Sequence, residues 1–440
     1  LSRGLGDVYK RQDIITAAQN AKLLSPAMAQ LSGEQKNAAL KEIAHALKAN
    51  AQKIFDANAQ DLEQAQKQRL AAPIIKRLTF NQGKLDEVLN GLDSLIGLEE
   101  PVNKTQLARR LDDGLELYRV SCPIGVIGVI FESRPDALVQ ISSLCLKSGN
   151  CSLLKGGSEA LNTNRALFET INSAAVKAGI PQGAMILLET RQDVNDMLNL
   201  SDYIDLIIPR GSNEFVKYIM EHTSIPVMGH ADGICHTYAD KYADIDMALK
   251  LIKDSKTQYV SVCNATETLL VHKDIALNLL PALKRELDNV TLLGCEETRR
   301  IIDAAPASEQ DWQTEYLDYK LSIRIIHSLA QAIDHINKYG SKHTDCIITQ
   351  DKQRASLFMN AVDSANVFWN CSTRFSDGFR YGFGAEVGIS TNKLHARGPV
   401  GLEGLLSYKY KLIGSGNIVA DYASGKRKFK HDAMNKDCPL

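Results

Sequence analysis

The sequence lacks the patterns that mark several common classes of protein. Its nine cysteines include no Cys-x-x-Cys pair and their number is odd, so neither a zinc site nor a disulfide framework is expected. No GxGxxG fingerprint occurs, which argues against a standard Rossmann dinucleotide site. The formal net charge is −1, so no overall electrostatic field points to nucleic acid or an anionic membrane as a partner.

Long apolar runs are also missing. The longest, Cys122 to Phe131 with two glycines included, is too short to span a bilayer. Hydrophobic residues make up 44% of the chain and charged residues 23%, which is the composition of a globular protein. Free thiols and the absence of an apolar leader favour a cytoplasmic protein.

What is present is an alternation of strand and helix patterns. The segment 123–131 is a branched apolar run typical of a strand buried on both faces. Such alternation predicts doubly wound parallel α/β sheets, whose ligands sit at the carboxyl ends of strands. We expect further strands at 151–154, 184–188, 206–208, 234–239, 267–272, 322–327 and 345–349, and helices at 135–148, 160–178, 213–222, 244–253 and 274–287.

The two ends of the chain do not follow this alternation of strands and helices. Residues 1–12 join no periodic pattern, and we expect a leader outside the fold. Residues 13–68 are helical, with Ser32 and Gln35 in a capping box. A turn signal at 112–114 predicts a β-hairpin over 107–120, the stretch 407–422 reads as strand, and the basic tail Lys426–Lys430 is expected to be solvated.

One cysteine has a setting suited to chemistry. Cys263 precedes the predicted strand 267–272 among small polar residues, where its sulfur could be accessible and where Asn264 and backbone N–H groups could hold an oxyanion. From its spacing alone, a buried structural cysteine is the commoner outcome.

Two glycine-containing turns end predicted strands. Lys155, Gly156 and Gly157 could contact a nucleotide, and Gly211-Ser212 could present N–H groups at a helix start to a phosphate. The plainer alternatives are a strand-to-helix turn and ordinary N-capping. Glu315 could hold ribose hydroxyls, although a lone glutamate is weak support.

Two arginine-containing loops could bind anionic groups. Ser133-Arg134 follows the buried strand, and Ser372-Thr373-Arg374 offers two hydroxyls and a guanidinium. The alternatives are a surface arginine and a solvated turn. His230, His236 and His395 have no metal-ligand spacing with any partner, so no metal site is expected.

Taken together, the segments 123–150, 153–157, 263–272 and 372–405 resemble the γ-glutamyl phosphate reductases of the aldehyde dehydrogenase superfamily. The resemblance runs from about residue 14 to residue 419. It implies an aldehyde dehydrogenase-like fold of two doubly wound α/β domains with a β-flap for oligomerisation. The implied domains are 13–105 with 122–237 for the cofactor, 106–121 with 405–422 for the flap, and 238–404 for catalysis.

The resemblance also implies roles. Cys263 matches the nucleophile, Lys155 the lysine on the adenosine ribose, Gly211-Ser212 the turn near the pyrophosphate, and Glu315 the glutamate on the nicotinamide ribose. Ser158 stands where this family more often has a lysine, and Ser212 where it often has a second glycine. The implied activity is NADPH-dependent reduction of L-glutamyl 5-phosphate to L-glutamate 5-semialdehyde through a cysteine thioester, in proline biosynthesis.

Other activities compete with this interpretation. Hydrolytic aldehyde dehydrogenases carry a glutamate that activates water, and the corresponding segment here, 225–230, has no carboxylate. An acylating enzyme using a coenzyme A thioester, a catalytically dead nucleotide-binding homologue, and the reductase part of a bifunctional synthase remain alternatives. The expected partners are L-glutamyl 5-phosphate, other copies of the chain through the flap, and a glutamate 5-kinase.

Overall fold

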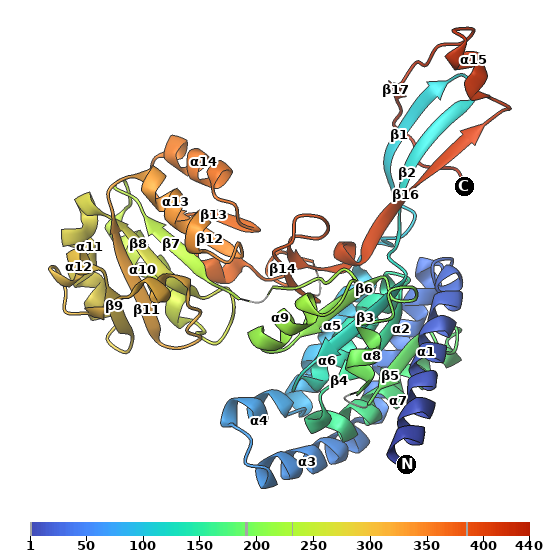
Figure 1. Ribbon diagram of the computed structural model, residues 1–440, viewed down its shortest axis with the longest axis horizontal. Helices are drawn as coiled ribbons and strands as arrows, with labels where there is room; N and C mark the ends of the chain where they lie inside the picture. Colours follow the sequence, from blue (N-terminus) through green and yellow to red (C-terminus); the bar gives the residue numbers. More distant parts are fainter. Residues whose placement is uncertain (1, 190–191, 231, 384–385) are drawn as a thin grey trace. The chain divides into compact units, whose positions relative to one another are not determined.

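The protein is described by a computed structural model that covers residues 2–189, 192–230, 232–383 and 386–440 (Figure 1). The chain divides into two compact units. Unit 1 comprises residues up to Val227, the short segment that ends at Val387, and Gly401–Leu440, and unit 2 comprises Met228–Phe383 and Gly388–Val400. Each unit is built on a parallel sheet covered by helices, which confirms the predicted α/β class.

The sheet of unit 1 has the order β5-β4-β3-β6, and all of its neighbouring strands are parallel. Its strands are β3 (Val126–Phe131), β4 (Cys151–Gly156), β5 (Met185–Leu188) and β6 (Leu206–Arg210). All six residues of β3 are buried, as its continuous apolar pattern predicts. The strand order reverses between β3 and β6, and in such sheets ligands bind beyond the carboxyl ends of the strands at that point.

Helices account for most of the remainder of unit 1. They are α1 (Ser2–Met28), α2 (Gly33–Ala49), α3 (Ala51–Lys67), α4 (Ala72–Leu78), α5 (Gln82–Gly97), α6 (Pro135–Lys147), α7 (Leu161–Lys177), α8 (Gln192–Met197) and α9 (Asn213–Glu221). The capping box is confirmed, because the Ser32 hydroxyl accepts from the Gln35 N–H and the Gln35 side chain accepts from the Ser32 N–H. Residues 2–12 form the first turns of α1, and their exclusion from the fold stays a prediction.

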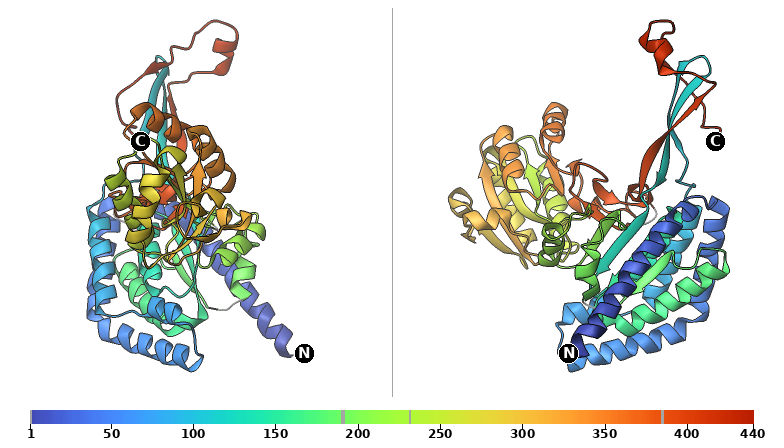
Figure 2. Two further views of the ribbon diagram at one scale, coloured as in Figure 1. Left: turned by 90° about the vertical axis from the view of Figure 1, so that its left-hand side faces the viewer. Right: turned by 45° about the vertical axis from the view of Figure 1, so that its right-hand side comes forward.

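A second sheet in unit 1, the flap sheet, is antiparallel and projects away from the helices of that unit (Figure 2). Its order is β16-β2-β1-β17, with β1 (Thr105–Asp112), β2 (Leu115–Pro123), β16 (Leu406–Gly414) and β17 (Asp432–Ala433). The predicted hairpin is therefore confirmed. The predicted strand over 407–422 is wrong in its second half, because the chain leaves the sheet after Gly414 and forms α15 (Val419–Ala423).

The basic tail Lys426–Lys430 is largely exposed, as expected, but it also contacts the hairpin. Arg427 pairs with Asp112 at 2.8 Å, and the backbone N–H of Lys430 donates to the carbonyl of Leu111 at 2.8 Å. The tail thus returns to the hairpin, where β17 pairs with β1. Local patterns could not predict this return, because it depends on ion pairs between residues more than 300 positions apart.

Unit 2 contains a parallel sheet of order β10-β9-β11-β8-β7-β12-β13. Apolar clusters cover the sheet on both faces, one centred on Leu269 and Ile323 and the other on Tyr238 and Phe358. The strands are β7 (Cys235–Ala239), β8 (Thr266–His272), β9 (Thr291–Gly294), β10 (Ala305–Pro306), β11 (Lys320–Ile326), β12 (Thr344–Ile348) and β13 (Asn366–Trp369), with β14 (Gly388–Ser390) and β15 (Gly398–Val400) forming a separate antiparallel pair.

The helices of unit 2 are α10 (Ile245–Thr257), α11 (Lys273–Glu286), α12 (Glu296–Arg299), α13 (Leu329–Tyr339) and α14 (Lys352–Ala361). Short 3-10 helices occur at η2 (Glu309–Gln313) and η3 (Thr373–Phe375) in this unit, and at η1 (Ser158–Ala160) and η4 (Leu402–Leu405) in unit 1. Within the described parts of the chain, no helix is long and apolar enough to cross a membrane.

Candidate active site

Cys263 lies in the loop that joins α10 to β8 in unit 2, and its side chain is half-buried. Two residues, Gly233 and Cys235, hold the main chain of this loop in place. The Cys235 thiol donates to the Cys263 carbonyl at 3.1 Å, and a Cβ on Gly233 would overlap the main chain of Cys263. No side chain larger than hydrogen fits at position 233, so the main chain fixes where the sulfur lies.

Most other cysteines are poor candidates for a nucleophile. Burial raises the pKa of the Cys151 thiol to about 12, and it raises the pKa of other thiols as well, which disfavours the reactive thiolate. The other thiols whose pKa is raised are Cys122, Cys145, Cys235, Cys346 and Cys371.

Asn264 ties the cysteine loop to the segment that follows β13. Its amide donates to the carbonyl of Ser376 at 2.8 Å, and its own carbonyl accepts from the Thr373 hydroxyl at 2.7 Å. The side-chain oxygen of Asn264 is buried and has no hydrogen-bond partner among the described residues. One amide hydrogen is thus used structurally, and the second is the one that an oxyanion could accept.

The predicted Ser372-Thr373-Arg374 group lies against this loop and is almost completely buried, so it is not a solvated turn. The hydroxyl of Ser372 bonds to that of Ser255 at 3.2 Å, and the hydroxyl of Thr373 is used by Asn264. Both hydroxyls therefore position the loop. Arg374 Nε donates to the Gln258 side chain at 2.9 Å, which leaves the rest of its guanidinium as the cationic group of this loop.

Burial lowers the pKa of Arg374, and the nearby charge of Arg380 lowers it further, whereas the Cys263 sulfur opposes the shift. That interaction places the guanidinium close enough to Cys263 to act on its charge. Sequence reasoning predicted these two residues separately, and the structure brings them together.

Glu315 lies in the loop between η2 and β11 and is half-buried. Burial is the main reason that the pKa values of Cys235 and Glu267 are raised, and the charge of Glu315 adds to both increases, so Glu315 lies in the same region of unit 2 as the cysteine loop. The loop is anchored by two bonds to Leu317, one donated to Glu267 at 3.3 Å and one accepted from Ser261 at 3.3 Å.

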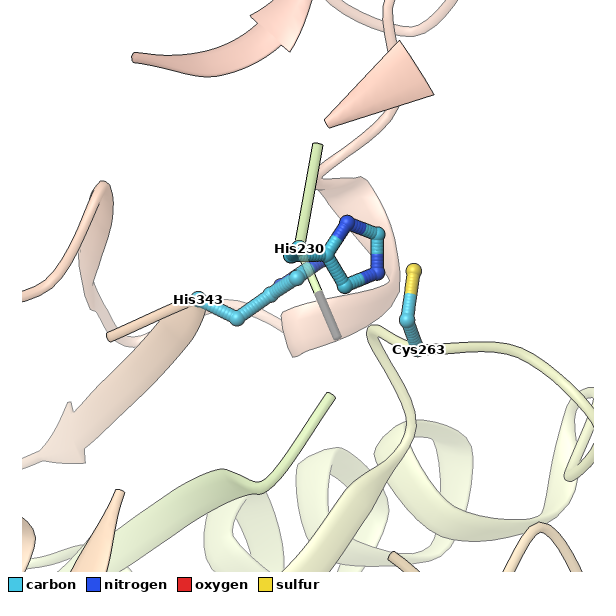
Figure 3. A group of neighbouring side chains, drawn as sticks. All are labelled: His230, Cys263 and His343. Carbon is cyan, nitrogen blue, oxygen red and sulfur yellow. The ribbon is translucent and has the colours of Figure 1, made fainter. Parts of the chain in front are cut away.

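Two histidines lie close to the sulfur, and sequence reasoning missed this. Ligand-capable atoms of His230, Cys263 and His343 all lie within 4.8 Å of one another (Figure 3). The spacing along the chain gave no sign of this cluster, because the three residues precede different strands and meet only when the sheet forms. The expectation of no metal site, drawn from the spacing of His230 along the chain, stays a prediction, although the structure brings three ligand-capable side chains together.

The predicted nucleotide contacts lie in unit 1, at strand ends. Lys155 is buried at the end of β4, and its ammonium donates to the carbonyl of Gly156. A Cβ on Gly156 would overlap the buried side chain of Asn164, and one on Gly157 would overlap the end of the Glu159 side chain, so a larger residue at either position would displace a neighbour.

The second turn follows β6. Ser212 is the N-cap residue of α9, but its hydroxyl makes no capping bond. Instead its backbone N–H donates to a Glu132 carboxylate oxygen at 3.0 Å, and a Cβ on Gly211 would overlap that carboxylate. An anionic oxygen therefore already occupies this N–H, as the start of a helix favours.

Ser133 and Arg134 follow β3, also in unit 1. Ser133 has a positive φ of 49°, and both its N–H and its hydroxyl donate to Glu159, at 2.6 and 2.8 Å. Arg134 occupies the N-cap position of α6 and is exposed. A strained backbone held by two bonds to one carboxylate is typical of a functional site rather than of a plain turn.

Comparisons with known proteins agree with this arrangement. The model of the aldehyde dehydrogenase family matches residues 7–319, and the chain belongs to that family. Fold similarity extends to an NADP-complexed glyceraldehyde-3-phosphate dehydrogenase from Methanocaldococcus jannaschii, at a TM-score of 0.66 and 15% identity over 92% of this chain and 95% of that one.

Three proteins with higher sequence identity show to which group of aldehyde dehydrogenases the chain belongs. Gamma-glutamyl phosphate reductases from Ruminiclostridium cellulolyticum and Acetivibrio thermocellus are 64% and 63% identical over 96% of this chain and 99% of theirs. The crystal structure of gamma-glutamyl phosphate reductase from Thermotoga maritima matches with a TM-score of 0.90 and 39% identity, over 92% of this chain and 99% of that one. Within the aldehyde dehydrogenases, the chain belongs to the γ-glutamyl phosphate reductases.

Proposed function

We propose that this chain reduces L-glutamyl 5-phosphate to L-glutamate 5-semialdehyde, with release of phosphate and oxidation of NADPH, as a step of proline biosynthesis. Membership of the γ-glutamyl phosphate reductases supports the reaction. The observation that best supports the chemistry is the half-buried side chain of Cys263. Gly233 packs closely against the main chain of this residue, and Arg374 interacts electrostatically with its sulfur.

Cys263 is the nucleophile of the proposed mechanism. Its thiolate attacks the acyl carbon, the tetrahedral intermediate expels phosphate, and a thioester remains on the protein. The oxyanion formed on the way is stabilised by N–H donors near the sulfur, for which the Cys263 backbone and the remaining amide hydrogen of Asn264 are the candidates. One such donor typically contributes roughly 3–4 kcal/mol to the transition state.

Reduction requires that water does not consume the thioester. The segment Ile225–His230, which corresponds to the water-activating part of hydrolytic aldehyde dehydrogenases, contains no carboxylate. Glu267 is the acidic residue of β8, and it is fully buried and paired with Lys256 at 2.6 Å. Because neither that segment nor the paired Glu267 offers a free carboxylate to activate water, hydrolysis of the thioester is expected to be slow and hydride transfer can compete.

The residues of unit 1 fit a dinucleotide cofactor. A Cβ at Gly156, Gly157 or Gly211 would crowd a neighbouring side chain, and the Ser212 N–H already donates to an anionic oxygen of Glu132, at the place where a phosphate oxygen could accept. Lys155 and Gly211-Ser212 would hold the adenosine ribose and the pyrophosphate, and Glu315 in unit 2 is the candidate for the nicotinamide ribose. When bound, NADPH supplies the hydride that converts the thioester to the aldehyde.

Arginine side chains are the candidates for the substrate's anionic groups. Arg374 presents a cation near the sulfur, and Ser133 with Arg134 presents a second anion-binding loop. A guanidinium recognises a carboxylate or a phosphate through paired N–H bonds. Ser372 and Thr373 contribute by holding Arg374 in place, since their own hydroxyls are bonded within the protein.

The remaining proposals concern assembly and location. The flap sheet is proposed to join copies of the chain into a homo-oligomer. The acyl phosphate is labile, so we also propose functional coupling to the glutamate 5-kinase that makes it, in the cytosol.

The decisive experiment is the reverse reaction. Purified protein should oxidise glutamate 5-semialdehyde only when inorganic phosphate is present, with NADP preferred over NAD. Oxidation that proceeds equally well without phosphate would show hydrolytic chemistry and overturn the proposal, and dependence on coenzyme A in place of phosphate would show an acylating enzyme.

A further inference from the structure

The hydrogen bonding of His230 fixes which of its ring nitrogens carries a proton. Its Nδ1 lies 2.8 Å from the carbonyl oxygen of Ile389, which follows the start of β14. A carbonyl oxygen only accepts, so Nδ1 is the donor. In the neutral imidazole the lone pair is then on Nε2, as for a histidine oriented by a backbone carbonyl.

That imidazole lies beside the nucleophile. Figure 3 shows the Cys263 sulfur pointing toward the ring of His230, and the ligand-capable atoms of the two residues lie within 4.8 Å of each other. Such separations in a structure without substrate commonly shorten when the reacting complex forms. A thiol and an imidazole with a fixed tautomer are the two parts of an activated nucleophile.

Building on the proposed reductase reaction, we propose that His230 is the acid–base partner of Cys263. It accepts the thiol proton through Nε2 before attack and returns a proton during the reaction. The backbone carbonyl of Ile389 orients the ring. In this arrangement Cys263 is the nucleophile, His230 is the base, and the Ile389 carbonyl is the acceptor that holds the base in place. The family's general-base glutamate is not needed in this arrangement.

His343 is a less suitable base. It is fully buried, and its Nδ1 is engaged with the Thr344 hydroxyl at 2.8 Å, so protonation would place a charge in the interior. Its ring packs edge-on against His230, with centroids 4.8 Å apart and an interplanar angle of 70°. His343 therefore positions the His230 ring, which is itself half-buried and can be solvated when charged.

The groups around the pair favour a charge-separated state. Arg374 from η3 is the cation that acts on Cys263, and Glu315, from the loop before β11, is an anion in the same region. Cys235 on β7 is buried and burial holds its pKa well above the usual range, so it stays a thiol. Once His230 has taken the proton, its imidazolium lies next to the Cys263 thiolate and stabilises it.

The proton balance closes over the two half-reactions. The thiol proton moves to His230 Nε2, the thiolate adds to the acyl carbon, and the C–O bond to phosphate breaks. The imidazolium gives its proton to the departing phosphate, which leaves as hydrogen phosphate. After the thioester carbon has received hydride, the C–S bond breaks, the aldehyde forms, and the thiolate takes a proton from solvent through His230. One proton is consumed per turnover.

The test measures the sulfur directly, without turnover. Each cysteine's reaction rate with iodoacetamide is followed by peptide mass spectrometry between pH 5.5 and 9.5 for the wild type, His230→Asn, His230→Gln and the surface control His327→Asn. We expect Cys263 of both His230 variants to react about tenfold more slowly at pH 7. We also expect their rate profile to move toward that of an ordinary thiol, near pH 8.5.

Internal and catalytic controls separate the possible outcomes. The reaction rate of Cys371 reports whether a variant remains folded, and turnover of the His230 variants should fall about 10²–10⁴-fold. Profiles for Cys263 that superimpose in wild type and both His230 variants would overturn the base assignment. If Cys263→Ser is inactive but those profiles superimpose, only the role of His230 fails; if Cys263→Ser stays active, the proposed reductase mechanism fails.

Discussion

The ammonium of Lys256, at the end of α10, lies 2.6 Å from a carboxylate oxygen of Glu267 on β8, and neither side chain is exposed to solvent. Burial raises the pKa of Glu267 to about 7 against the attraction of Lys256, and burial lowers the pKa of Lys256. The two charges are stable inside the protein because they compensate each other. Glu267 also accepts the N–H of Leu317, so the pair supports the loop that carries Glu315.

Removing one member of the pair should be costly. Lys256→Met leaves the Glu267 carboxylate buried without its partner, and we expect the free energy of unfolding to fall by about 3–5 kcal/mol. The double variant Lys256→Met, Glu267→Gln should recover most of that loss, because no charge remains and the amide oxygen can still accept from Leu317. Urea denaturation of the three proteins checks both expectations; equal destabilisation of the single and double variants would contradict them.

Cys263→Ser should remove catalysis and spare the fold. The substitution keeps a side chain of similar size but replaces a thiolate-forming group with a much weaker nucleophile, so turnover should fall on the order of 10³-fold or more. The thermal midpoint should stay within a few degrees of the wild type. Near-normal turnover in the variant would mean that the sulfur is not the nucleophile.

Arg374→Ala should weaken binding of the substrate more than binding of the cofactor. Loss of the guanidinium removes a charge-assisted contact worth about 1.5–3 kcal/mol, so the KM for glutamate 5-semialdehyde should rise roughly ten- to a hundredfold. The exposed Arg300, which pairs with Glu296, provides a control as Arg300→Ala. Equal increases in both KM values would identify Arg374 as a structural residue.

Stability should decline in mild acid through His335. Burial, followed by the nearby His236, lowers the pKa of His335 to about 2, and its Nδ1 accepts from Arg324 at 2.9 Å. Because its folded pKa is depressed below the unfolded value near 6.5, its contribution to stability is present above pH 6.5 and is lost as the pH falls below it.

The expected loss between pH 7 and pH 5.5 is about 1 kcal/mol from this group. His335→Asn, whose side-chain oxygen can replace Nδ1 as acceptor, should lack that part of the decline, whereas the exposed His327→Asn should retain it. Urea denaturation at the two pH values measures the difference. An unchanged decline in His335→Asn would show that other groups titrate.

Charges placed on the edge of the flap sheet should dissociate the proposed oligomer. Tyr408, Tyr410 and Leu412 alternate along β16 and are between 51% and 58% exposed, so one face of an edge strand is apolar and uncovered within a single chain. Tyr410→Asp and Leu412→Asp should lower the mass measured by light scattering. Lys409→Asp, on the opposite face, should not. An unchanged mass in all three would exclude this strand as the interface.

Local sequence patterns predicted much of the fold, because strands such as β3 are continuously apolar and α2 carries its own cap. These patterns did not predict the structure of segments whose conformation depends on contacts with residues far away in the sequence. The chain after Gly414 forms a turn and α15 instead of continuing as a strand, and Arg427 pairs with Asp112 from the other end of the sequence. A propensity for strand says nothing about such pairing.

The candidate site divides in the same way. The sequence marked Cys263, Arg374 and the glycine turns as candidates, and the role of Cys263 as nucleophile came only from the resemblance to a known family. His230, His343 and the Lys256–Glu267 pair were not identified, because each acquires meaning only from a partner on another strand or loop. The Nδ1 of His230 donates to the backbone carbonyl of Ile389. Because every residue has a backbone carbonyl, no pattern of side chains in the sequence could reveal this contact.

The close approach of Gly233 to Cys263 limits how this enzyme can be altered. A Cβ at position 233 would meet the main chain and the Cβ of Cys263, so any larger residue there would displace the reactive loop itself. Variants designed to change the substrate range should therefore leave position 233 unchanged and alter side chains instead, because a shortened side chain does not move the backbone that carries the thiol.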